Sequence, residues 1–241
     1  MTAGLLLIHA FPLDSRLWEG QRLGPHTVAP NLPGFGGSQP AGETMTMAAG
    51  AGRCLEALDA AGLDHAVVCG LSMGGYVALE LWRSAPARVA GLILANTRAG
   101  ADSPEGVQAR LALAARLAAD GNVLVDDPPP LLSAGADEEL RAKVRGWIAD
   151  QPAAAIAAAA RGMAARPDST PDLAGIDVPT LVITSDADTL IPAQVSAPMA
   201  DQITGARLAV IEGAGHLSNL EAPEVFNALL REHLAACGVA P

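Results

Sequence analysis

A serine at the tip of a predicted turn is the residue of this chain with the clearest chemical potential. An apolar run at residues 66–71 ends in a Gly-x-Ser-x-Gly pattern at residues 70–74, and residues 76–82 have helix-forming composition. This order predicts a buried strand, a sharp turn and a helix, with Ser72 at the tip. Such a turn strains the serine backbone and points the hydroxyl away from the sheet, while the flanking glycines avoid collisions. Ser72 is therefore a candidate nucleophile.

A serine hydroxyl is a weak nucleophile, so Ser72 would need a base and a group that orients the base. His216 lies in a Gly-rich loop directly after the last apolar run, and we predict that it is the base. The orienting carboxylate should follow the run at residues 179–184. Asp188 is favoured because it lies deeper in that loop, and Asp186 is the alternative. The chain order Ser, Asp, His is the one expected for a triad on an α/β sheet.

The other four histidines fit a catalytic role less well. His26 and His65 immediately precede predicted strands, which places them at the opposite edge of the sheet. His233 falls within the predicted terminal helix, where we expect a solvated side chain. His9 ends the first strand, and we expect it to anchor the following loop through hydrogen bonds.

Acyl transfer at Ser72 would also require hydrogen-bond donors that stabilise a tetrahedral oxyanion. One candidate is the backbone N–H of Met73, because N–H groups at a helix N-terminus are unpaired and the helix dipole favours negative charge there. The second candidate is the backbone N–H of Phe11, in the loop after the first apolar run. We predict that these two groups form the oxyanion hole.

The apolar runs also indicate the fold. Strands are predicted at residues 5–9, 27–29, 66–71, 89–95, 179–184 and 207–211. Helical patterns separate them, so the chain predicts an α/β fold with a mainly parallel, doubly wound sheet of about six strands. Residues 103–172 carry no strand signal and are rich in alanine, which predicts an inserted helical cap on a core formed by residues 1–102 and 173–241. The loops that carry the candidate site residues leave the carboxyl ends of strands, where open α/β sheets bind ligands.

Composition narrows the classes of function. The 241 residues are half hydrophobic but only 3% aromatic, and the formal net charge is -11. An acidic chain is not expected to bind nucleic acid or an anionic membrane. Three cysteines are too few for a disulfide framework, and no signal sequence or long apolar span is evident, so we expect a cytoplasmic protein. Cysteine and histidine lack metal-ligand spacing, and no phosphate-binding lysine follows the Gly-rich turn, so we expect no metal or cofactor.

These features together resemble the α/β-hydrolase superfamily over nearly the whole chain. The landmarks are His-Ala-Phe-Pro at residues 9–12, Pro-Gly-Phe-Gly-Gly-Ser at 33–38, Gly-Leu-Ser-Met-Gly-Gly at 70–75, residues 178–183, Asp188, and Gly-His-Leu-Ser-Asn-Leu-Glu-Ala-Pro at 215–223. Within the superfamily the chain is most similar to small carboxylesterases and enol-lactone hydrolases. The resemblance implies that Ser72 is the nucleophile, His216 the base and then acid, and Asp188 its orienting group.

The chain departs from the family pattern in two places. The family usually has His-Gly in the oxyanion loop, where this chain has His9-Ala10. Family members also begin with an antiparallel hairpin, whereas only residues 1–4 precede the first apolar run here. We therefore expect a wholly parallel sheet with an edge that is exposed or through which copies of the chain associate as a homo-oligomer.

The resulting hypothesis is a serine hydrolase that cleaves a small-molecule carboxylic ester or lactone through an acyl-enzyme. Thioester hydrolysis, carbon–carbon bond hydrolysis and acyl transfer use the same triad and stay open as alternatives. A non-catalytic small-molecule receptor on the same fold is the competing class. Serine at position 72 argues against related dehalogenases and epoxide hydrolases, which use aspartate. Arg98 could bind a substrate carboxylate, although a surface or carbonyl-bonding role is favoured.

Overall fold

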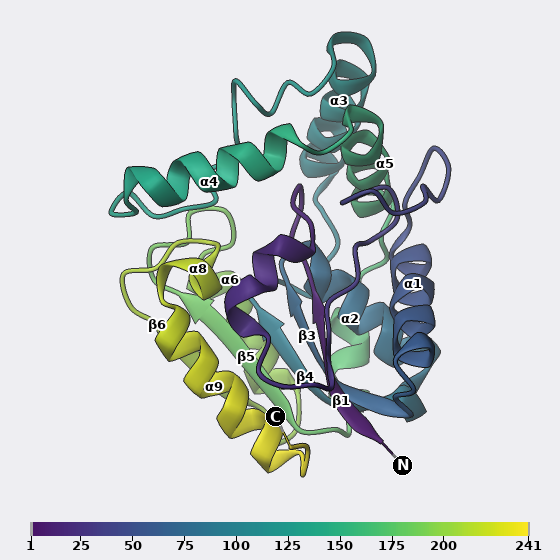
Figure 1. Cartoon of the computed structure of the whole chain (residues 1–241), viewed down its shortest axis with the longest axis vertical. Coiled ribbons are helices and arrows are strands. Elements are labelled where there is room, and N and C mark those ends of the chain that lie inside the picture. Colours follow the sequence, from purple (N-terminus) through teal and green to yellow (C-terminus); the bar gives the residue numbers. More distant parts are fainter. Residues whose placement is uncertain (1, 241) are drawn as a thin grey trace.

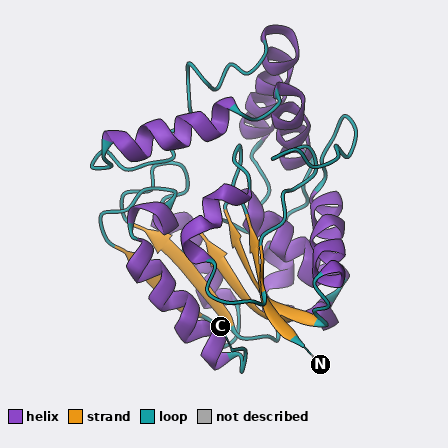
Figure 2. Ribbon diagram, viewed as in Figure 1, coloured by secondary structure: helices purple, strands orange, loops and turns teal. Residues whose placement is uncertain are grey.

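A six-stranded, wholly parallel sheet forms the centre of the protein. A computed structural model describes residues 2–240, and Figures 1 and 2 show the sheet with helices on both of its faces. The strands are β1 (Ala3–Ile8), β2 (Thr27–Val28), β3 (His65–Leu71), β4 (Val89–Ala95), β5 (Thr180–Ser185) and β6 (Arg207–Ile211). Their order is β2-β1-β3-β4-β5-β6, and every neighbouring pair is parallel. The α/β fold predicted from the sequence is confirmed.

The strand order also locates a crevice. The direction of winding reverses between β1 and β3, and open α/β sheets bind ligands at such a switch point, beyond the carboxyl ends of the strands. The central strands β1, β3, β4 and β5 are buried along almost their whole length, as their continuous apolar sequences require. The edge strand β6 differs, because Leu208 and Val210 are 45% and 49% exposed. Association through a sheet edge stays a prediction.

The helices that cover the sheet are held by close side-chain packing. On one face, α1 (Met47–Ala60) packs against α2 (Met73–Ser84). Gly50 allows this contact, because a Cβ there would lie 2.9 Å from Val77 Cγ2. The 3-10 helix η1 (Ser15–Gln21) packs against α9 (Pro223–Ala236), with the rings of Trp18 and Phe226 6.0 Å apart. Shorter helices complete the body: α6 (Ala193–Ser196), α7 (Pro198–Gln202), α8 (Ser218–Glu221), and the 3-10 helices η2 (Pro86–Arg88) and η3 (Thr170–Gly175).

Three further helices lie beyond the carboxyl ends of the strands, as Figure 1 shows. They are α3 (Pro104–Asp120), α4 (Glu138–Ala149) and α5 (Ala153–Ala164). Their starts follow from capping, since Ser103 accepts a hydrogen bond from the Gly106 N–H at 3.2 Å and Asp137 accepts one from Leu140 at 2.7 Å. All three belong to residues 103–172, the predicted cap; its status as a separate unit stays a prediction. Within residues 2–240, no helix has both the length and the apolar composition that a bilayer crossing requires.

The alanine-rich sequence of α5 allows it to lie directly on the body of the protein. A Cβ at Gly162 would come within 1.7 Å of the Met45 carbonyl oxygen, so only glycine fits there. The Met45 N–H donates to the Ala158 carbonyl at 3.0 Å, and Ala155 contacts the loop at Gly34. Small side chains in α5 therefore serve close packing.

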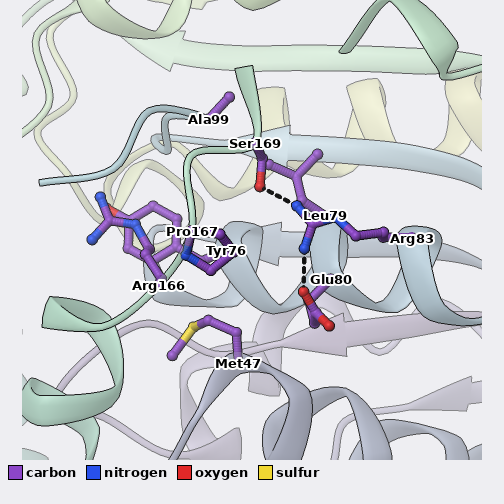
Figure 3. A pocket seen from close by; sticks show the side chains of 9 residues that line it. All are labelled: Met47, Tyr76, Leu79, Glu80, Arg83, Ala99, Arg166, Pro167 and Ser169. Atoms are coloured by element: carbon purple, nitrogen blue, oxygen red, sulfur yellow. Dashed lines mark hydrogen bonds and ion pairs between the residues drawn. The ribbon is translucent and has the colours of Figure 1, made fainter. Parts of the chain in front are cut away.

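The segment that returns from α5 to the body is fastened to α2. Figure 3 shows the guanidinium of Arg166 beside the ring of Tyr76, 4.1 Å from its centroid. Arg83, also on α2, donates to the Ser169 hydroxyl at 2.7 Å. Arg166 additionally pairs with Asp102, at the start of the helical segment, at 3.0 Å. Tyr76 and Arg83 of α2 thus hold the returning segment, and the Arg166–Asp102 pair joins that segment to the residue that precedes the helical segment.

Candidate active site

The Ser72 turn has the strained geometry that its sequence predicts. Ser72 lies between β3 and α2 with φ 56° and ψ -113°, a conformation that is rare for residues other than glycine. A Cβ at Gly70 would lie 2.1 Å from the Gly74 carbonyl oxygen, and one at Gly74 would lie 2.1 Å from that of Ile8. The Ser72 N–H donates to the Ala95 carbonyl at 2.9 Å. The turn is thus held tightly, and the serine side chain stays partly exposed at its tip.

A buried histidine–aspartate pair lies at the same edge of the sheet. His216 follows β6, Asp188 follows β5, and His216 Nδ1 lies 2.8 Å from Asp188 Oδ2. The other oxygen, Oδ1, accepts the N–H groups of Leu190 at 2.9 Å and Ile191 at 3.0 Å. Burial alone would raise the pKa of Asp188, but the hydrogen bond and charge of His216 and the hydrogen bond from Ile191 hold that pKa below its ordinary value. An ionised Asp188 places the imidazole proton on Nδ1, which leaves Nε2 able to accept a proton.

Of the two aspartates in the loop after β5, the structure brings only Asp188 to His216. Asp186 is exposed, and its carboxylate accepts the N–H of Gly213 at 2.7 Å. It therefore ties the loop after β5 to the loop after β6. The geometry favours Asp188 as the orienting carboxylate and gives Asp186 a role in loop structure.

The candidate nucleophile and base reach this edge from strands on either side of β4. No hydrogen bond joins the Ser72 hydroxyl to His216 among residues 2–240. Catalytic hydrogen bonds are often long before a substrate is bound, so this geometry is compatible with a base at His216. Ser72, His216 and Asp188 thus lie at the same edge of the sheet, and their role as a triad stays a prediction.

Two backbone N–H groups are available as oxyanion donors. Met73 is the first residue of α2, and Phe11 lies in the loop after β1. Within the part of the chain that the structure describes, neither N–H has a hydrogen-bond acceptor. The close approach of Gly74 to the carbonyl oxygens of Ile8 and His9 places the start of α2 against that loop. Both donors therefore lie at the switch point between β1 and β3.

The comparison with known proteins identifies the family. The sequence profile of the Alpha/beta hydrolase family matches residues 5–229. This chain belongs to the alpha/beta hydrolase family. It is an enzyme of the hydrolase type, and the superfamily resemblance noted in the sequence is confirmed.

Individual relatives agree with this assignment. The hydrolase is 35% identical to 3-oxoadipate enol-lactonase 1 of Acinetobacter baylyi over 177 residues, which cover 71% of this chain and 65% of the lactonase. The match thus spans just under two thirds of that relative. A structure of an esterase from Thermogutta terrifontis superposes with a TM-score of 0.92 at 37% identity, covering 98% of this chain and 90% of the esterase. An enol-lactonase from Burkholderia xenovorans gives 0.86 at 26% identity, covering 98% and 92%.

His9 anchors the loop after β1 of the hydrolase through hydrogen bonds, as the sequence predicts. Its Nε2 accepts the N–H of Leu32 at 3.0 Å, and its Nδ1 donates to the Ala10 carbonyl at 3.1 Å. Complete burial lowers the pKa of His9 to about 4, although the bond to Ala10 and the charge of Asp14 act in the opposite direction. His9 is therefore neutral near pH 7 and joins the loop after β1 to the loop after β2.

The expectation that His233 is solvated is wrong. Its side chain is only 2% exposed, and it lies on the inner side of α9 beside Gly91 of β4. The spacing of Phe226, Leu230, His233 and Leu234 places all four on one helical stripe, and this stripe packs on the sheet. Burial lowers the pKa of His233 as well.

Arg98 takes part in an ion cluster. Its guanidinium pairs with Asp102, a buried carboxylate that also pairs with Arg110 and Arg166. Burial opposes ionisation of Asp102, but hydrogen bonds from Arg166 and Arg110 lower its pKa to about 2. These contacts favour a structural role for Arg98 over recognition of a substrate carboxylate.

Sequence reasoning missed one residue in the middle of the site. Asn96 is fully buried, and its amide contacts both Asp188 and Ser218. A polar residue directly after β4, at the edge where Ser72 lies, was the available signal.

Proposed function

We propose that this hydrolase cleaves a carboxylic ester or lactone of a small molecule through an acyl-enzyme formed on Ser72. One observation carries the proposal: the strained Ser72 turn lies at the sheet edge to which a buried Asp188–His216 pair also projects. The relatives add support, because they include enzymes named as an esterase and as enol-lactonases.

In the first step, the Ser72 Oγ attacks the carbonyl carbon of the substrate while His216 Nε2 takes the hydroxyl proton. The carbonyl electron pair moves onto oxygen, and the N–H groups of Met73 and Phe11 donate to the resulting oxyanion. Asp188 keeps the imidazole oriented and stabilises its protonated form. The buried position of this pair strengthens the electrostatic interaction, since the surroundings screen it weakly.

In the second step, the oxyanion collapses and the bond from the acyl carbon to the leaving oxygen breaks. His216 gives its proton to that oxygen, which leaves as an alcohol, or as a hydroxyl group of the same molecule if the substrate is a lactone. A water molecule then attacks the acyl carbon while His216 accepts its proton. Collapse of the second tetrahedral intermediate releases the carboxylic acid and returns the proton to Ser72.

We further propose that residues 103–172 act as a cap that shapes the substrate pocket. The support is the position of α3, α4 and α5 beyond the carboxyl ends of the strands (Figure 1). Small side chains on α5 allow the cap to approach the body closely. The cap would therefore set the size of acyl or alcohol group that reaches Ser72.

Hydrolysis rates over a panel of aryl esters of graded acyl length, lactones, thioesters and amides test the proposal. We expect turnover of esters or lactones, and a loss of roughly 10⁴-fold or more in kcat for Ser72→Ala. Ser84→Ala is a matched control, because Ser84 lies on the exposed end of the same helix and contacts only backbone carbonyls. Hydrolysis confined to thioesters would replace the ester assignment, and tight ligand binding without turnover would indicate a receptor.

A further inference from the structure

Asn96 has an unusual position and conformation for a residue without an assigned role. It directly follows β4, the strand that lies between β3, which leads to Ser72, and β5, which leads to Asp188. Its side chain is 0% exposed and its φ is 43°. In the described residues, the only other non-glycine residue with positive φ is Ser72 itself. Strained backbone that persists at a site suggests a functional constraint.

The side chain of Asn96 connects the two loops that carry Asp188 and the candidate base His216. Its Nδ2 donates to Asp188 Oδ2 at 3.0 Å and to the Ser185 hydroxyl at 2.6 Å. Its Oδ1 accepts the hydroxyl of Ser218 at 2.7 Å. Ser185 in turn donates to the Gly215 carbonyl at 2.6 Å. One buried amide is thus linked to the carboxylate and to residues on both sides of the candidate base.

The backbone around Asn96 holds the candidate nucleophile. The Ala95 carbonyl accepts the Ser72 N–H at 2.9 Å, and the Thr97 hydroxyl donates to the Ser72 carbonyl at 2.8 Å. Thr97 also lies against the start of α2, where a Cβ at Gly75 would come within 2.4 Å of its Oγ1. The same three consecutive residues therefore bond to the Ser72 turn on one side and to the loops that carry Asp188 and His216 on the other.

We propose that Asn96 is a positioning residue that fixes the Asp188 carboxylate, and through it His216, relative to Ser72. This inference rests on the proposed function, because it concerns the geometry of the same site. The Asn96 amide and His216 Nδ1 donate to the same carboxylate oxygen, while two backbone N–H groups donate to the other. Donors on both oxygens determine the plane of the carboxylate, and with it the direction in which the imidazole points.

An uncharged amide is the group that this position requires. It donates toward Asp188 and accepts from Ser218 at once, which neither a carboxylate nor an aliphatic side chain of the same size can do. A cationic donor such as lysine would neutralise Asp188 and weaken its stabilisation of a protonated His216. Asparagine also tolerates positive φ better than most residues.

Two variants separate the contribution of the Asn96 side chain from that of its backbone conformation. Asn96→Gly removes the amide but accepts the positive φ, and Asn96→Asp keeps the shape but can donate to Asp188 only in its protonated form. For both we expect kcat for a short-chain aryl ester to fall about 10- to 100-fold, with KM changing by less than about threefold. Gln21→Ala is the matched control, because Gln21 is also a fully buried amide but bonds only to Asn219. It should lower thermal stability without changing kcat.

A double-mutant cycle tests whether Asn96 acts through Asp188. If it does, adding Asn96→Gly to Asp188→Asn should lower kcat/KM by less than about threefold, because the interaction is already lost. A merely structural role predicts that the two effects multiply.

A second readout does not depend on turnover. The His216 Nδ1 proton, hydrogen-bonded to a buried carboxylate, should give a low-field proton resonance that is assigned by its loss in His216→Gln. Asn96→Gly should shift or broaden this resonance, and Gln21→Ala should preserve it. An unchanged resonance with unchanged kcat would overturn the positioning role and leave the proposed function intact. If the unsubstituted protein hydrolyses no ester or lactone, the proposed function fails, and the resonance still decides whether Asn96 fixes the pair.

Discussion

The Ser72 turn requires glycine at the two positions that flank the serine, because no side chain fits there. At Gly70 and Gly74 the atoms that a Cβ would meet are backbone carbonyl oxygens at 2.1 Å, which cannot move aside as a flexible side chain would. The glycines are therefore required by close approach of the backbone, and substitution there should disturb the turn itself.

We predict that Gly70→Ala lowers the free energy of unfolding by about 2–3 kcal/mol or more, because its methyl group overlaps the Gly74 carbonyl. Gly52→Ala is the contrasting control. Gly52 lies within α1 with nothing within 4 Å of a Cβ, so alanine should raise the free energy of unfolding by about 0.5–1 kcal/mol. Urea unfolding of the three proteins measures both values. Equal effects at the two positions would contradict this account of the turn.

Residues were predictable from the sequence where a local pattern determines their position. Ser72 and His216 each follow directly from an apolar run that ends in a glycine-containing loop, which places them at one edge. Asn96 follows a strand in the same way, but its contacts with Asp188 and Ser218 join loops about a hundred residues apart. No local pattern encodes such contacts. His233 could have been placed correctly, because its spacing from Leu230 and Phe226 indicates the inner face of α9.

At the scale of elements, the helical segment 103–172 is joined to the loop that carries the candidate base. The Leu217 N–H donates to the Leu131 carbonyl at 2.9 Å. The Glu221 carboxylate accepts the N–H of Ser133 at 3.1 Å and that of Gly215 at 2.9 Å. A Cβ at Gly215 would lie 2.3 Å from the Ser133 nitrogen, so the two loops are in direct contact. A change in the position of the helical segment should therefore change the position of the loop that carries His216.

We predict that Glu221→Gln lowers kcat for an ester substrate by about 10-fold, because a neutral amide accepts weaker hydrogen bonds from these two N–H groups. Glu224→Gln is the matched control, since Glu224 is exposed on the first turn of α9. Steady-state kinetics with both variants measure the effect. If Glu221→Gln and Glu224→Gln give the same kcat, the link between the helical segment and the base loop has no catalytic consequence.

The elements themselves were largely predictable, because long apolar runs and strong caps act locally. The sequence places the last helix at residues 223–236, which are its bounds in the structure, and the strand predicted at 89–95 is β4. A helix was expected to begin near Pro192, where α6 begins, but the short helices α7 and α8 were not predicted. Helices of four or five residues are too short to be stable alone, so tertiary contacts rather than sequence propensity determine them.

At the scale of the whole molecule, two buried neutral histidines make stability depend on pH. Burial lowers the pKa of His9 from 6.5 to about 4 and lowers that of His233 in the same direction. Between pH 6.5 and about pH 4, the histidines of the unfolded chain bind protons that the buried histidines of the folded protein do not bind. Stability is therefore lost as pH falls from about 6.5 toward 4. The carboxylates of Asp14 and Asp188, whose pKa values are lowered, contribute further losses only at more acidic pH.

For His9 alone, we predict a loss of about 3 kcal/mol in the free energy of unfolding between pH 7 and pH 4. His9→Gln should be less stable than the unsubstituted protein near pH 7, but its stability should fall less steeply over this range. His26→Gln is the control, since His26 is exposed. Urea unfolding at about pH 7, 5.5 and 4.5 gives the three slopes. Parallel slopes for all three proteins would show that His9 is not buried in its neutral form.

The central claim concerns the whole site, since it requires Ser72, His216 and Asp188 to act together on an acyl group. Its most direct test is to label the protein with a fluorophosphonate and to map the modified residue by peptide mass spectrometry. We predict one label per chain, located on Ser72, absent in Ser72→Ala and formed far more slowly in His216→Ala. Ester turnover by a protein that takes up no label, or a label on a residue other than Ser72, would contradict the account.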